Sequence, residues 1–322
     1  MASLQLTAEV TMTPFARLHV VVTCAQRKSV PVPDELHLRQ FTGLPAVRAR
    51  VWARALGKSS VPPRPALTLY AGEHWDIVRS WCSGTARARV GVDVWVCSAG
   101  YGLIPTGALV RPYAATFAPG QPDSVSGGAE GAVRWWQALS AWEGPAPGAP
   151  RSIAELVATG TVRRLLVVLS EPYLRACRAD VMATVTGPTQ NCRMSIISAG
   201  TKSDPDLAHL LLPVDARLQL ALGGTRQALN VRVARHLIER GLERHEDMSA
   251  YLARLLGDQP PLPRYDRRTV SDPEVAAFVR RRLRTDPRVS HTRLLREFRV
   301  LGYACEQARF ARVFGTETGE SE

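Results

Sequence analysis

Acidic side chains follow the last of several apolar runs in this sequence, where they could take part in chemistry. Asp204 and Asp206 come shortly after the apolar run 193–199, and Asp123 lies in an earlier polar segment. A carboxylate at such a position can stabilise a cationic transition state or activate a water molecule. We therefore take Asp204 and Asp206 as the first catalytic candidates and Asp123 as the next. The alternative is structural, because an aspartate before a proline commonly caps a helix.

Amines and a thiol occupy comparable positions after apolar runs. Lys28 and Lys202 are notable because nearly all of the other basic residues are arginines. Either amine could clamp a phosphate or attack a sugar carbon as a nucleophile, and Lys202 joins the catalytic candidates. Cys24 could contact a substrate or act as a nucleophile, although a buried thiol is the commoner role of such a cysteine.

The stretch "VCSAGYGLIP" (96–105) joins an apolar run to a group of small residues and a tyrosine. Glycines there permit either a tight turn or the close approach of a ligand to the backbone. On the second interpretation, Gly100 leaves room for a base or a sugar. Ser98 and Tyr113 then supply polar and stacking contacts, and Tyr101 is a further catalytic candidate.

Three more groups of polar residues are candidates for binding a ligand. In "YAGEHW" a carboxylate and an imidazole stand beside Trp75, in "SEPY" a hydroxyl and a phenol follow an apolar run, and "GGTR" could cradle a phosphate at a helix N-terminus. Each group also has a structural interpretation, as a helix start or as a turn between helices. The residues are Glu73, His74, Ser170, Tyr173, Gly224, Thr225 and Arg226.

Short apolar runs rich in β-branched residues alternate with segments of helical periodicity. This alternation predicts an α/β domain with a mainly parallel sheet covered by helices. Ligands of such sheets bind at the carboxyl ends of the strands, which is where the polar residues above are found. The expected strands are 17–23, 66–71, 92–98, 164–170 and 193–199.

Charge is distributed unevenly along the chain. The 322 residues include 41 Lys and Arg against 29 Asp and Glu, a net charge of +12. The segment from Arg264 to Phe314 holds 13 arginines and 6 acidic residues, a local net charge of +7. Such a concentration indicates a polyanionic partner, and nucleic acid is favoured over a membrane.

The same segment has the pattern of a small all-helical unit. Ser271 and Glu274 have the spacing of a capping box, Ser290 can cap a second helix, and a third helix is expected from about Cys305 to Gly315. These helices fit a helix-turn-helix domain, and the alternative is a dimerisation or capping unit. The residues that the last helix would present to a DNA groove are Gln307, Arg309 and Arg312.

We therefore expect an α/β catalytic domain at 1–257, a linker at 258–270, a helical DNA-binding domain at 271–315 and a tail at 316–322. No apolar run is long enough for a membrane helix and no secretory leader is evident, so a cytoplasmic protein is expected. The six cysteines lack the spacing of a zinc site or a disulfide framework. Walker and dinucleotide-binding motifs are absent as well. We expect neither metal nor cofactor, and no obligate protein partner is evident.

Several motifs resemble those of the YaaA-like bacterial domains. "SAGYGLIPTGALVRPY" (98–113) is similar to the Ser-x-x-Tyr-Gly-Leu-x-x-Pro and Pro-Tyr pattern of that family. "VLSEPYL" (168–174) resembles a later Ser-x-Glu-Tyr element, and "TCAQRK" (23–28) resembles the opening strand and loop. The resemblance covers residues 17–240. It departs from the family just after Pro-Tyr, where Ala114 replaces the usual acidic or arginine residue.

With the "GGTR" segment and the arginine-rich C-terminal unit, the chain also resembles bacterial anti-phage DNA glycosylases. This resemblance implies that double-stranded DNA with modified bases, notably glucosylated hydroxymethylcytosine, is the substrate. The enzyme would flip the base out of the stack and hydrolyse its N-glycosidic bond, leaving an abasic site in a role in antiviral defence. Two alternatives remain open, namely a non-enzymatic DNA-binding regulator and a base-exchanging transglycosylase.

Overall fold

The computed structural model describes residues 17–83, 91–125, 127–187, 192–201, 204–262 and 266–319. The chain forms two compact units, Met1–Pro260 and Pro261–Glu322, which are considered separately below. Within the described ranges, no helix is both long and apolar enough to cross a membrane.

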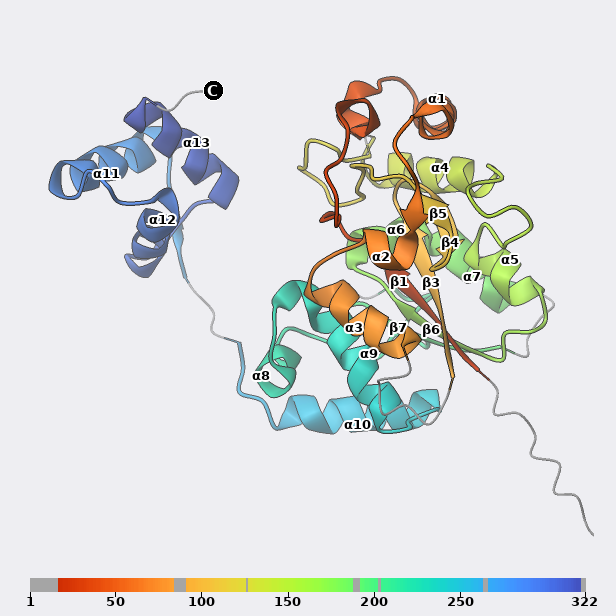
Figure 1. Ribbon diagram of the computed structural model, residues 1–322. Coiled ribbons are helices and arrows are strands. Elements are labelled where there is room, and N and C mark those ends of the chain that lie inside the picture. The colour runs from red at the N-terminus through yellow and green to blue at the C-terminus, as the bar shows by residue number, and fades with distance from the viewer. Residues whose placement is uncertain are drawn as a thin grey trace, which may run out of the picture. The chain divides into compact units, whose positions relative to one another are not determined.

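The first unit is built on a sheet of five strands in the order β4-β3-β1-β6-β7 (Figure 1). The four strands from β3 to β7 are mutually parallel, and β4 is antiparallel to β3. Central strand β1 is almost entirely buried, as expected for an apolar strand with neighbours on both sides and helices on both faces. The strands are β1 Leu18–Thr23, β3 Val92–Ser98, β4 Gly102–Pro105, β6 Arg164–Val168 and β7 Arg193–Ile197.

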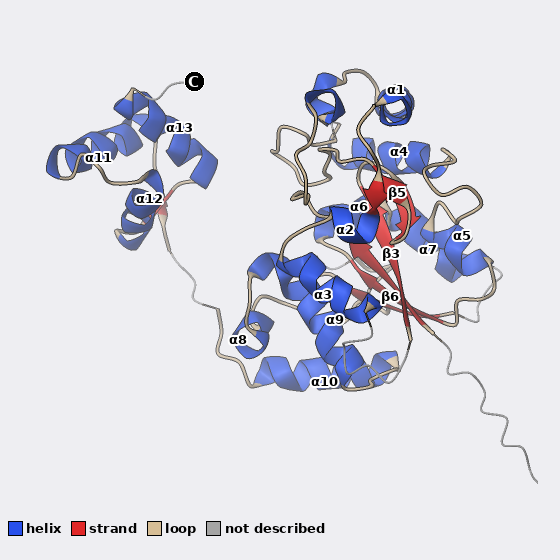
Figure 2. Cartoon of the chain, viewed as in Figure 1, coloured by secondary structure: helices blue, strands red, loops and turns tan. Residues whose placement is uncertain are grey.

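Ten helices in the described part of this unit cover the sheet (Figure 2). Helices α3, α8, α9 and α10 pack together as one group, and α1, α4, α5, α6 and α7 form the other. The expected α/β architecture is therefore confirmed. The helices are α1 Pro45–Lys58, α2 Ala66–Leu69, α3 Glu73–Cys82, α4 Gly128–Ser140, α5 Ile153–Ala158, α6 Glu171–Ala176, α7 Arg178–Thr186, α8 Leu218–Leu222, α9 Leu229–Glu239 and α10 His245–Gly257.

The strand expected at 66–71 is wrong, because Ala66–Leu69 forms the short helix α2. The amide of Tyr70 donates to the carbonyl of Ala66, which closes a helical turn after Pro65. So short an apolar run does not distinguish a helix from a strand by its sequence alone, and in the structure Ala66, Leu69 and Tyr70 are buried on one helical face while Thr68 is exposed. The residues just before α2 instead form β2 (Arg64–Pro65), which pairs with β5 (Leu109–Val110).

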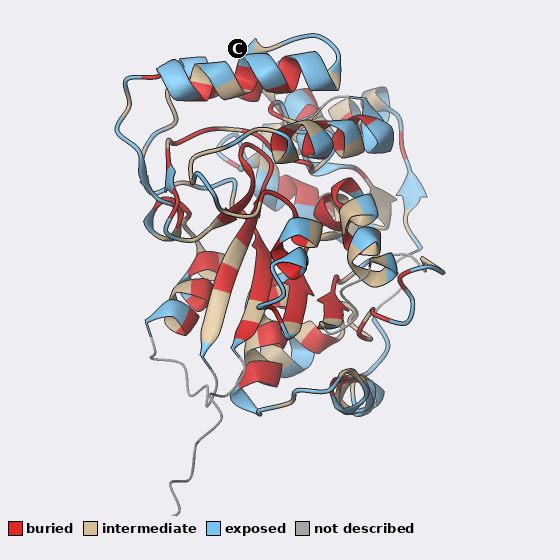
Figure 3. Cartoon of the chain, turned by 90° about the vertical axis from the view of Figure 1, so that its right-hand side faces the viewer, coloured by how far each residue is buried: buried red, intermediate tan, exposed pale blue. Residues whose placement is uncertain are grey.

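The second unit has a small core of buried apolar residues of its own, and Figure 3 colours each described residue of the chain by its burial. Its elements are β8 Arg268–Thr269, α11 Asp272–Thr285, α12 His291–Val300, β9 Tyr303–Ala304 and α13 Gln307–Thr318. The capping box at Ser271 and Glu274 is present, and Ser290 caps α12 as expected. Two differences from the expected all-helical unit are found. Strands β8 and β9 pair in parallel, and α13 continues through Gly315 to Thr318.

Arg151 ties the antiparallel edge of the sheet to the loop after α4. Its buried guanidinium donates to the carbonyl of Leu103 at 2.6 Å, to that of Trp142 at 2.9 Å and to that of Tyr101. Each carbonyl would lose a buried donor if this side chain were shortened or made apolar.

We expect Arg151→Met to lower the free energy of unfolding by about 2–4 kcal/mol, because several buried acceptors are left unpaired at once. Urea denaturation of the full chain measures this change. Arg134→Met is the matched control, since Arg134 is exposed and pairs only with Glu130 one helical turn away. Its effect should stay within about 0.5 kcal/mol, and equal effects of the two substitutions would contradict the role given to Arg151.

Candidate functional site

The sheet has a topological switch point between the carboxyl ends of β1 and β6. The chain leaves β1 towards β3 on one side, and leaves β6 towards β7 on the other. Ligands of open parallel sheets bind in the crevice that this divergence creates. The loop that follows Thr23 and the helix α6 that follows β6 both begin there.

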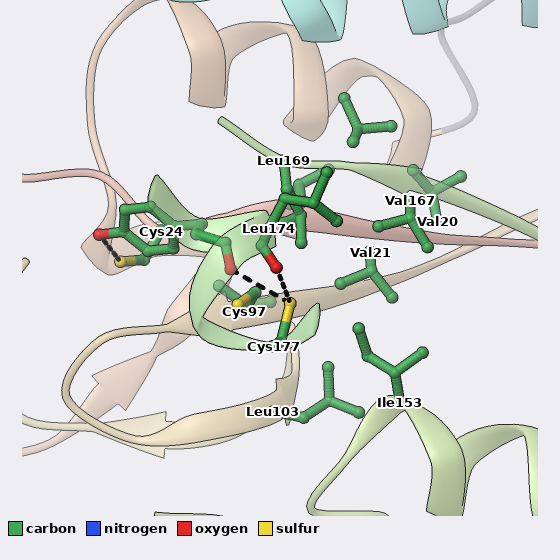
Figure 4. Close-up of a cluster of buried hydrophobic side chains, with 14 of the residues drawn as sticks. Val20, Val21, Cys24, Cys97, Leu103, Ile153, Val167, Leu169, Leu174 and Cys177 are labelled. Carbon is green, nitrogen blue, oxygen red and sulfur yellow. Dashed lines mark hydrogen bonds between the residues drawn. The ribbon is translucent and has the colours of Figure 1, made fainter. Parts of the chain in front are cut away.

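A thiol and a phenol meet at this switch point. The Sγ atom of Cys24, just after β1, lies 3.4 Å from the hydroxyl of Tyr173 on α6. The same phenol lies 3.5 Å from Oγ1 of Thr116. Burial raises the pKa of the Tyr173 phenol, so it stays protonated at neutral pH. Figure 4 shows Cys24 beside Cys97 and Cys177, whose thiols pack among aliphatic side chains.

A second set of hydroxyl groups lies at the end of β3. The phenol of Tyr113 is 2.7 Å from Oγ of Ser98 and 3.0 Å from the phenol of Tyr70. All three side chains are fully buried. Burial is the largest cause that raises the pKa of both phenols, and the neighbouring Cys24 raises them further. Cys24 therefore links the two sets into one cluster of neutral donors and acceptors.

Lys28 lies beside this cluster. Its ammonium lies 4.3 Å from the ring centre of Tyr113 and 5.5 Å from that of Tyr70. It donates to the carbonyl oxygens of Ala25 and Gln26, at 2.7 and 3.1 Å. Burial lowers the pKa of Lys28 from 10.5 to about 8, against the opposing effects of Cys24 and Asp123. A buried amine with a lowered pKa can act as a base or a nucleophile near neutral pH.

Asp123 belongs to the same neighbourhood, since its charge acts on the pKa of Lys28. Its carboxylate is buried and accepts from the backbone amide of Arg39 at 3.0 Å and from the Arg39 guanidinium at 3.2 Å. Nδ1 of His37 lies 3.2 Å from Oδ2 of the same carboxylate. Asp123, which the sequence analysis placed after Asp204 and Asp206 as a catalytic candidate, is therefore the carboxylate that lies near Lys28 in the structure.

The turn at 98–101 is held by structural contacts. The backbone amides of Gly100 and Tyr101 both donate to Oγ of Ser98, at 3.2 and 3.0 Å. The indole of Trp52 donates to the carbonyl of Gly100 at 2.8 Å. A Cβ atom on Gly100 would lie 2.4 Å from Cε2 of Tyr113. The glycine therefore makes room for the Tyr113 ring, not for a base or a sugar as one interpretation of the sequence proposed.

Tyr101 also has structural partners. Its ring stacks on Trp142 with centroids 5.8 Å apart, and its hydroxyl accepts from the backbone amide of Arg111 at 2.9 Å. Burial raises the pKa of its phenol, which excludes a phenolate at neutral pH. Tyr101 thus supports the β3–β4 turn and the loop at Arg111.

Asp204 and Asp206 lie beside the end of β7 and not in the central cluster. Arg178 binds Asp204 through two bonds of 2.6 and 2.9 Å and also contacts Asp206. The guanidinium holds the pKa of Asp204 below its ordinary value. Asp204 and Arg178 line a cavity of about 370 Å³. A carboxylate paired in this way is better placed to bind a cation than to accept a proton. Lys202 lies outside the described residues.

The "GGTR" segment is occupied by an acidic side chain of the protein itself. Glu73 on α3 accepts from the backbone amide of Thr225 at 3.1 Å and pairs with Arg232. The hydroxyl of Thr225 accepts from the amide of Ala228 at 3.3 Å and caps the turn 226–228. A Cβ atom on Gly224, whose φ is +72°, would overlap Arg232. Glu73, Gly224 and Thr225 therefore join α3 to the start of α9, while Arg226 remains exposed.

The remaining binding candidates of the first unit surround the cluster. Burial lowers the pKa of His74 to about 4, so its imidazole is neutral, and it contacts the backbone of Thr23. Trp75 is fully buried and packs on Tyr70 with centroids 4.6 Å apart. Ser170 is the N-cap residue of α6. These residues support the elements that carry Lys28 and Tyr173.

Among the residues expected to contact DNA bases, some are exposed and others are bonded to side chains of the protein itself. Gln307 is exposed at the start of α13. Arg309 donates to Asp272 at 2.5 Å and to the carbonyl of Val270, and Arg312 contacts the same aspartate. By contrast, Arg284, Arg288 and Arg296 are exposed, and no acidic partner is found for them among the described residues.

Sequence reasoning missed Tyr70, His37 and Arg39, which complete the site. Tyr70 falls in the run that was interpreted as a strand, and His37 and Arg39 precede any recognisable motif. The bonds of His37 and Arg39 to Asp123 span more than eighty residues of sequence, so local spacing carries no signal for them. Among the described residues, no group of His, Cys, Asp and Glu is arranged to hold a metal ion.

No protein-family model matches the chain, and no curated protein is significantly similar to it.

The lowered pKa of Lys28 makes stability depend on pH. Between pH 8 and 10.5 the unfolded chain binds this proton more tightly than the folded protein does, so the free energy of unfolding rises with pH across that window. Lys28→Met removes the contribution. We expect wild type to gain about 1–2 kcal/mol relative to Lys28→Met between pH 7.5 and pH 10.

Urea denaturation at several pH values in that window measures the difference. Lys58→Met is the control, because Lys58 is exposed and should leave the wild-type slope unchanged. Parallel curves for wild type and Lys28→Met would show that burial does not lower the pKa of Lys28.

Proposed function

We propose that this protein is a DNA N-glycosylase that releases a modified base from double-stranded DNA. The observation that carries the proposal is Lys28, a half-buried amine with a pKa of about 8 at the switch point of the sheet. At pH 7 about one molecule in ten then holds this amine in its neutral, nucleophilic form.

The chemistry assigned to Lys28 is attack on the sugar carbon that bears the base. The base is first extruded from the duplex, because this carbon is inaccessible inside the stack. A bond forms between Nζ of Lys28 and C1′ while the glycosidic bond breaks, and the electron pair of that bond leaves with the base, which takes up a proton. Ring opening then gives a Schiff base, as a proton moves from nitrogen to the ring oxygen. Water hydrolyses this imine to an abasic site and regenerates the amine, so the net reaction is hydrolysis.

The neighbouring groups suit the charges that develop in this reaction. The buried carboxylate of Asp123 acts on Lys28 through its charge and would stabilise the cationic sugar. The neutral hydroxyl groups of Tyr113 and Tyr173 are donors that could bind the departing base. No step of this scheme requires a metal or a cofactor.

The second unit supplies the DNA affinity in this proposal. Arg284, Arg288 and Arg296, for which no acidic partner is found among the described residues, can bind phosphates without first breaking an ion pair. A helix-turn-helix role for α12 and α13 fits their order along the chain, with the exposed Gln307 at the start of the second helix.

Selectivity for a modified base follows from the requirement that the enzyme spare the DNA of its own cell. A site that hydrogen-bonds the hydroxyl groups of a base-linked sugar leaves polar groups unpaired when that sugar is missing. Each such loss costs about 1–3 kcal/mol, so two or three are sufficient for strong discrimination. We therefore propose glucosylated hydroxymethylcytosine as the substrate and defence against phage as the role.

Single-turnover reactions test the proposal with duplexes that carry glucosylated hydroxymethylcytosine, hydroxymethylcytosine or cytosine. We expect release of the glucosylated base alone, detected by mass spectrometry. Borohydride should reduce the Schiff base to a stable amine and join wild-type protein to DNA. Lys28→Met should lose this adduct and release base more than about a hundredfold more slowly.

Lys58→Met is the matched control and should behave as wild type. Base release without any trapped adduct would assign the attack to water and exclude Lys28 as the nucleophile. No release from any of the duplexes would contradict the glycosylase proposal and favour the DNA-binding regulator.

The exposed arginines without an acidic partner among the described residues make a separate prediction about affinity. Replacing Arg284, Arg288 and Arg296 by glutamine should lower the slope of log affinity against log salt by about one unit per lost phosphate contact. Fluorescence anisotropy with duplex DNA at several salt concentrations measures this slope. The matched control replaces Arg268, Arg280 and Arg293, which pair with Glu274, Glu317 and Asp286. Equal slopes for both triple variants and wild type would contradict the assignment.

A further inference from the structure

The second unit has a cavity of about 280 Å³ where β8, the end of α12 and the start of α13 come together. This volume lies just below the range of sites for drug-sized ligands, so the cavity suits a small chemical group. Two of its lining residues, Thr269 and Glu306, are exposed, and a ligand can therefore enter from solvent.

Three guanidinium groups converge on this cavity. Arg267, Arg299 and Arg309 line it together with a single carboxylate, that of Glu306. Like charges that share a small space repel one another, and an anion placed among them relieves this repulsion. The lining therefore favours an anion over a neutral or cationic ligand.

Bonds to backbone carbonyl groups hold the three guanidinium groups in place. Nε of Arg267 donates to the carbonyl of Arg299 at 3.2 Å. Nη2 of Arg299 in turn donates to the carbonyl of Cys305 at 3.0 Å. Nη2 of Arg309 donates to the carbonyl of Val270 at 2.8 Å. Because a carbonyl fixes a guanidinium without neutralising it, these bonds preorganise the positive charge around the cavity.

Carboxylates balance this charge only in part. Arg309 shares the carboxylate of Asp272 with Arg312, and no carboxylate partner of Arg299 is found among the described residues. Burial raises the pKa of the Cys305 thiol, whereas the charges of Arg309 and Arg299 both lower it. Both guanidinium groups therefore lie near this thiol, and Cys305 can report on what occupies the cavity.

Among common anionic groups, a phosphate fits three guanidinium groups best. A carboxylate has two oxygen atoms in one plane, which match the fork of a single arginine. A phosphate presents oxygen atoms on several sides, so it can accept from Arg267, Arg299 and Arg309 at once. The hydroxyl of Thr269 is a further possible donor from the same lining.

We propose that this cavity binds one phosphate of the DNA backbone through Arg267, Arg299 and Arg309. The assignment rests on the DNA-binding role proposed for the second unit. It gives Arg309 a contact with the backbone in place of the base contact expected from its position on α13, and the exposed Gln307 faces the groove. Contacts with phosphates fix the orientation of a protein on the duplex, whereas contacts with base edges specify the sequence.

Fluorescence anisotropy of the full chain with duplex DNA tests whether the guanidinium groups share one phosphate. The double variant Arg299→Gln/Arg309→Gln should bind about tenfold more weakly, and its slope of log affinity against log salt should fall by about one unit and not by two. The matched control is Arg268→Gln/Arg280→Gln, which removes two charges outside the cavity that pair with Glu274 and Glu317. It should keep the wild-type slope.

Alkylation of Cys305 by iodoacetamide, followed by mass spectrometry, tests the cavity without relying on DNA. Inorganic phosphate, added at constant ionic strength, should slow the reaction of Cys305 about tenfold by covering the thiol, and duplex DNA should do the same. Cys82, an exposed thiol of the first unit, should react at an unchanged rate. The double variant should lose the protection by both ligands. Failure of the cavity is thereby distinguished from failure of the proposed glycosylase function.

The proposal is overturned by an unchanged slope of the double variant, by a fall of about two units, or by protection of Cys305 by neither ligand. Protection by inorganic phosphate alone would assign the cavity to free phosphate and overturn the contact with DNA.

If the double variant loses its cooperative unfolding transition, Thr269→Glu replaces it, because a carboxylate at this exposed lining residue repels phosphate. Thr269→Glu should abolish the protection of Cys305 by inorganic phosphate. Thr292→Glu is its control, since it makes the same change of charge at an exposed residue of α12 outside the cavity, and should keep the protection. Full protection in Thr269→Glu would also overturn the assignment.

Discussion

The packing of Tyr113 against the β3–β4 turn is the contact on which the candidate site depends. A methyl group on Gly100 would overlap the ring, so the turn must carry a glycine there for the phenol to reach Ser98 and Tyr70. The ring then provides the face on which the Lys28 ammonium lies. Burial of these phenols removes water from one side of the amine, and the same loss of water lowers its pKa. The burial of these phenols therefore requires a glycine at position 100 and also lowers the pKa of Lys28.

In the proposed reaction, this arrangement supplies the reacting groups from side chains at the switch point. Parallel strands bring Cys24 and α6 to one edge of the sheet, where Tyr173 meets the thiol. The resulting cluster consists of neutral hydroxyl groups beside an amine and a fixed carboxylate at Asp123. Neutral donors can bind a leaving group without competing for the amine's charge, and the carboxylate stabilises positive charge that develops nearby.

The sequence predicted the four parallel strands and the three helices of the second unit, because apolar runs and helical periodicity are local signals. It failed at 66–71, where a run too short to show its period forms α2. It also ranked Asp204 above Asp123, since both are loop aspartates and only the fold shows that Arg178 neutralises one of them. Glu73 was assigned to a ligand for the same reason, because its partner Arg232 is 159 residues away. Proximity to strand ends found Cys24 and Lys28, but pairings between distant residues required the structure.

The central claim is that burial at the switch point turns Lys28 into a reactive amine, and its titration can be observed directly. The chain contains only Lys28, Lys58 and Lys202, so labelling lysine with ¹³C at Cε gives few signals in a nuclear magnetic resonance spectrum. Assignment follows from the signal that Lys28→Met removes. A titration midpoint near pH 8 for that signal is the result that the account predicts. A midpoint near 10.5 for Lys28 would contradict it.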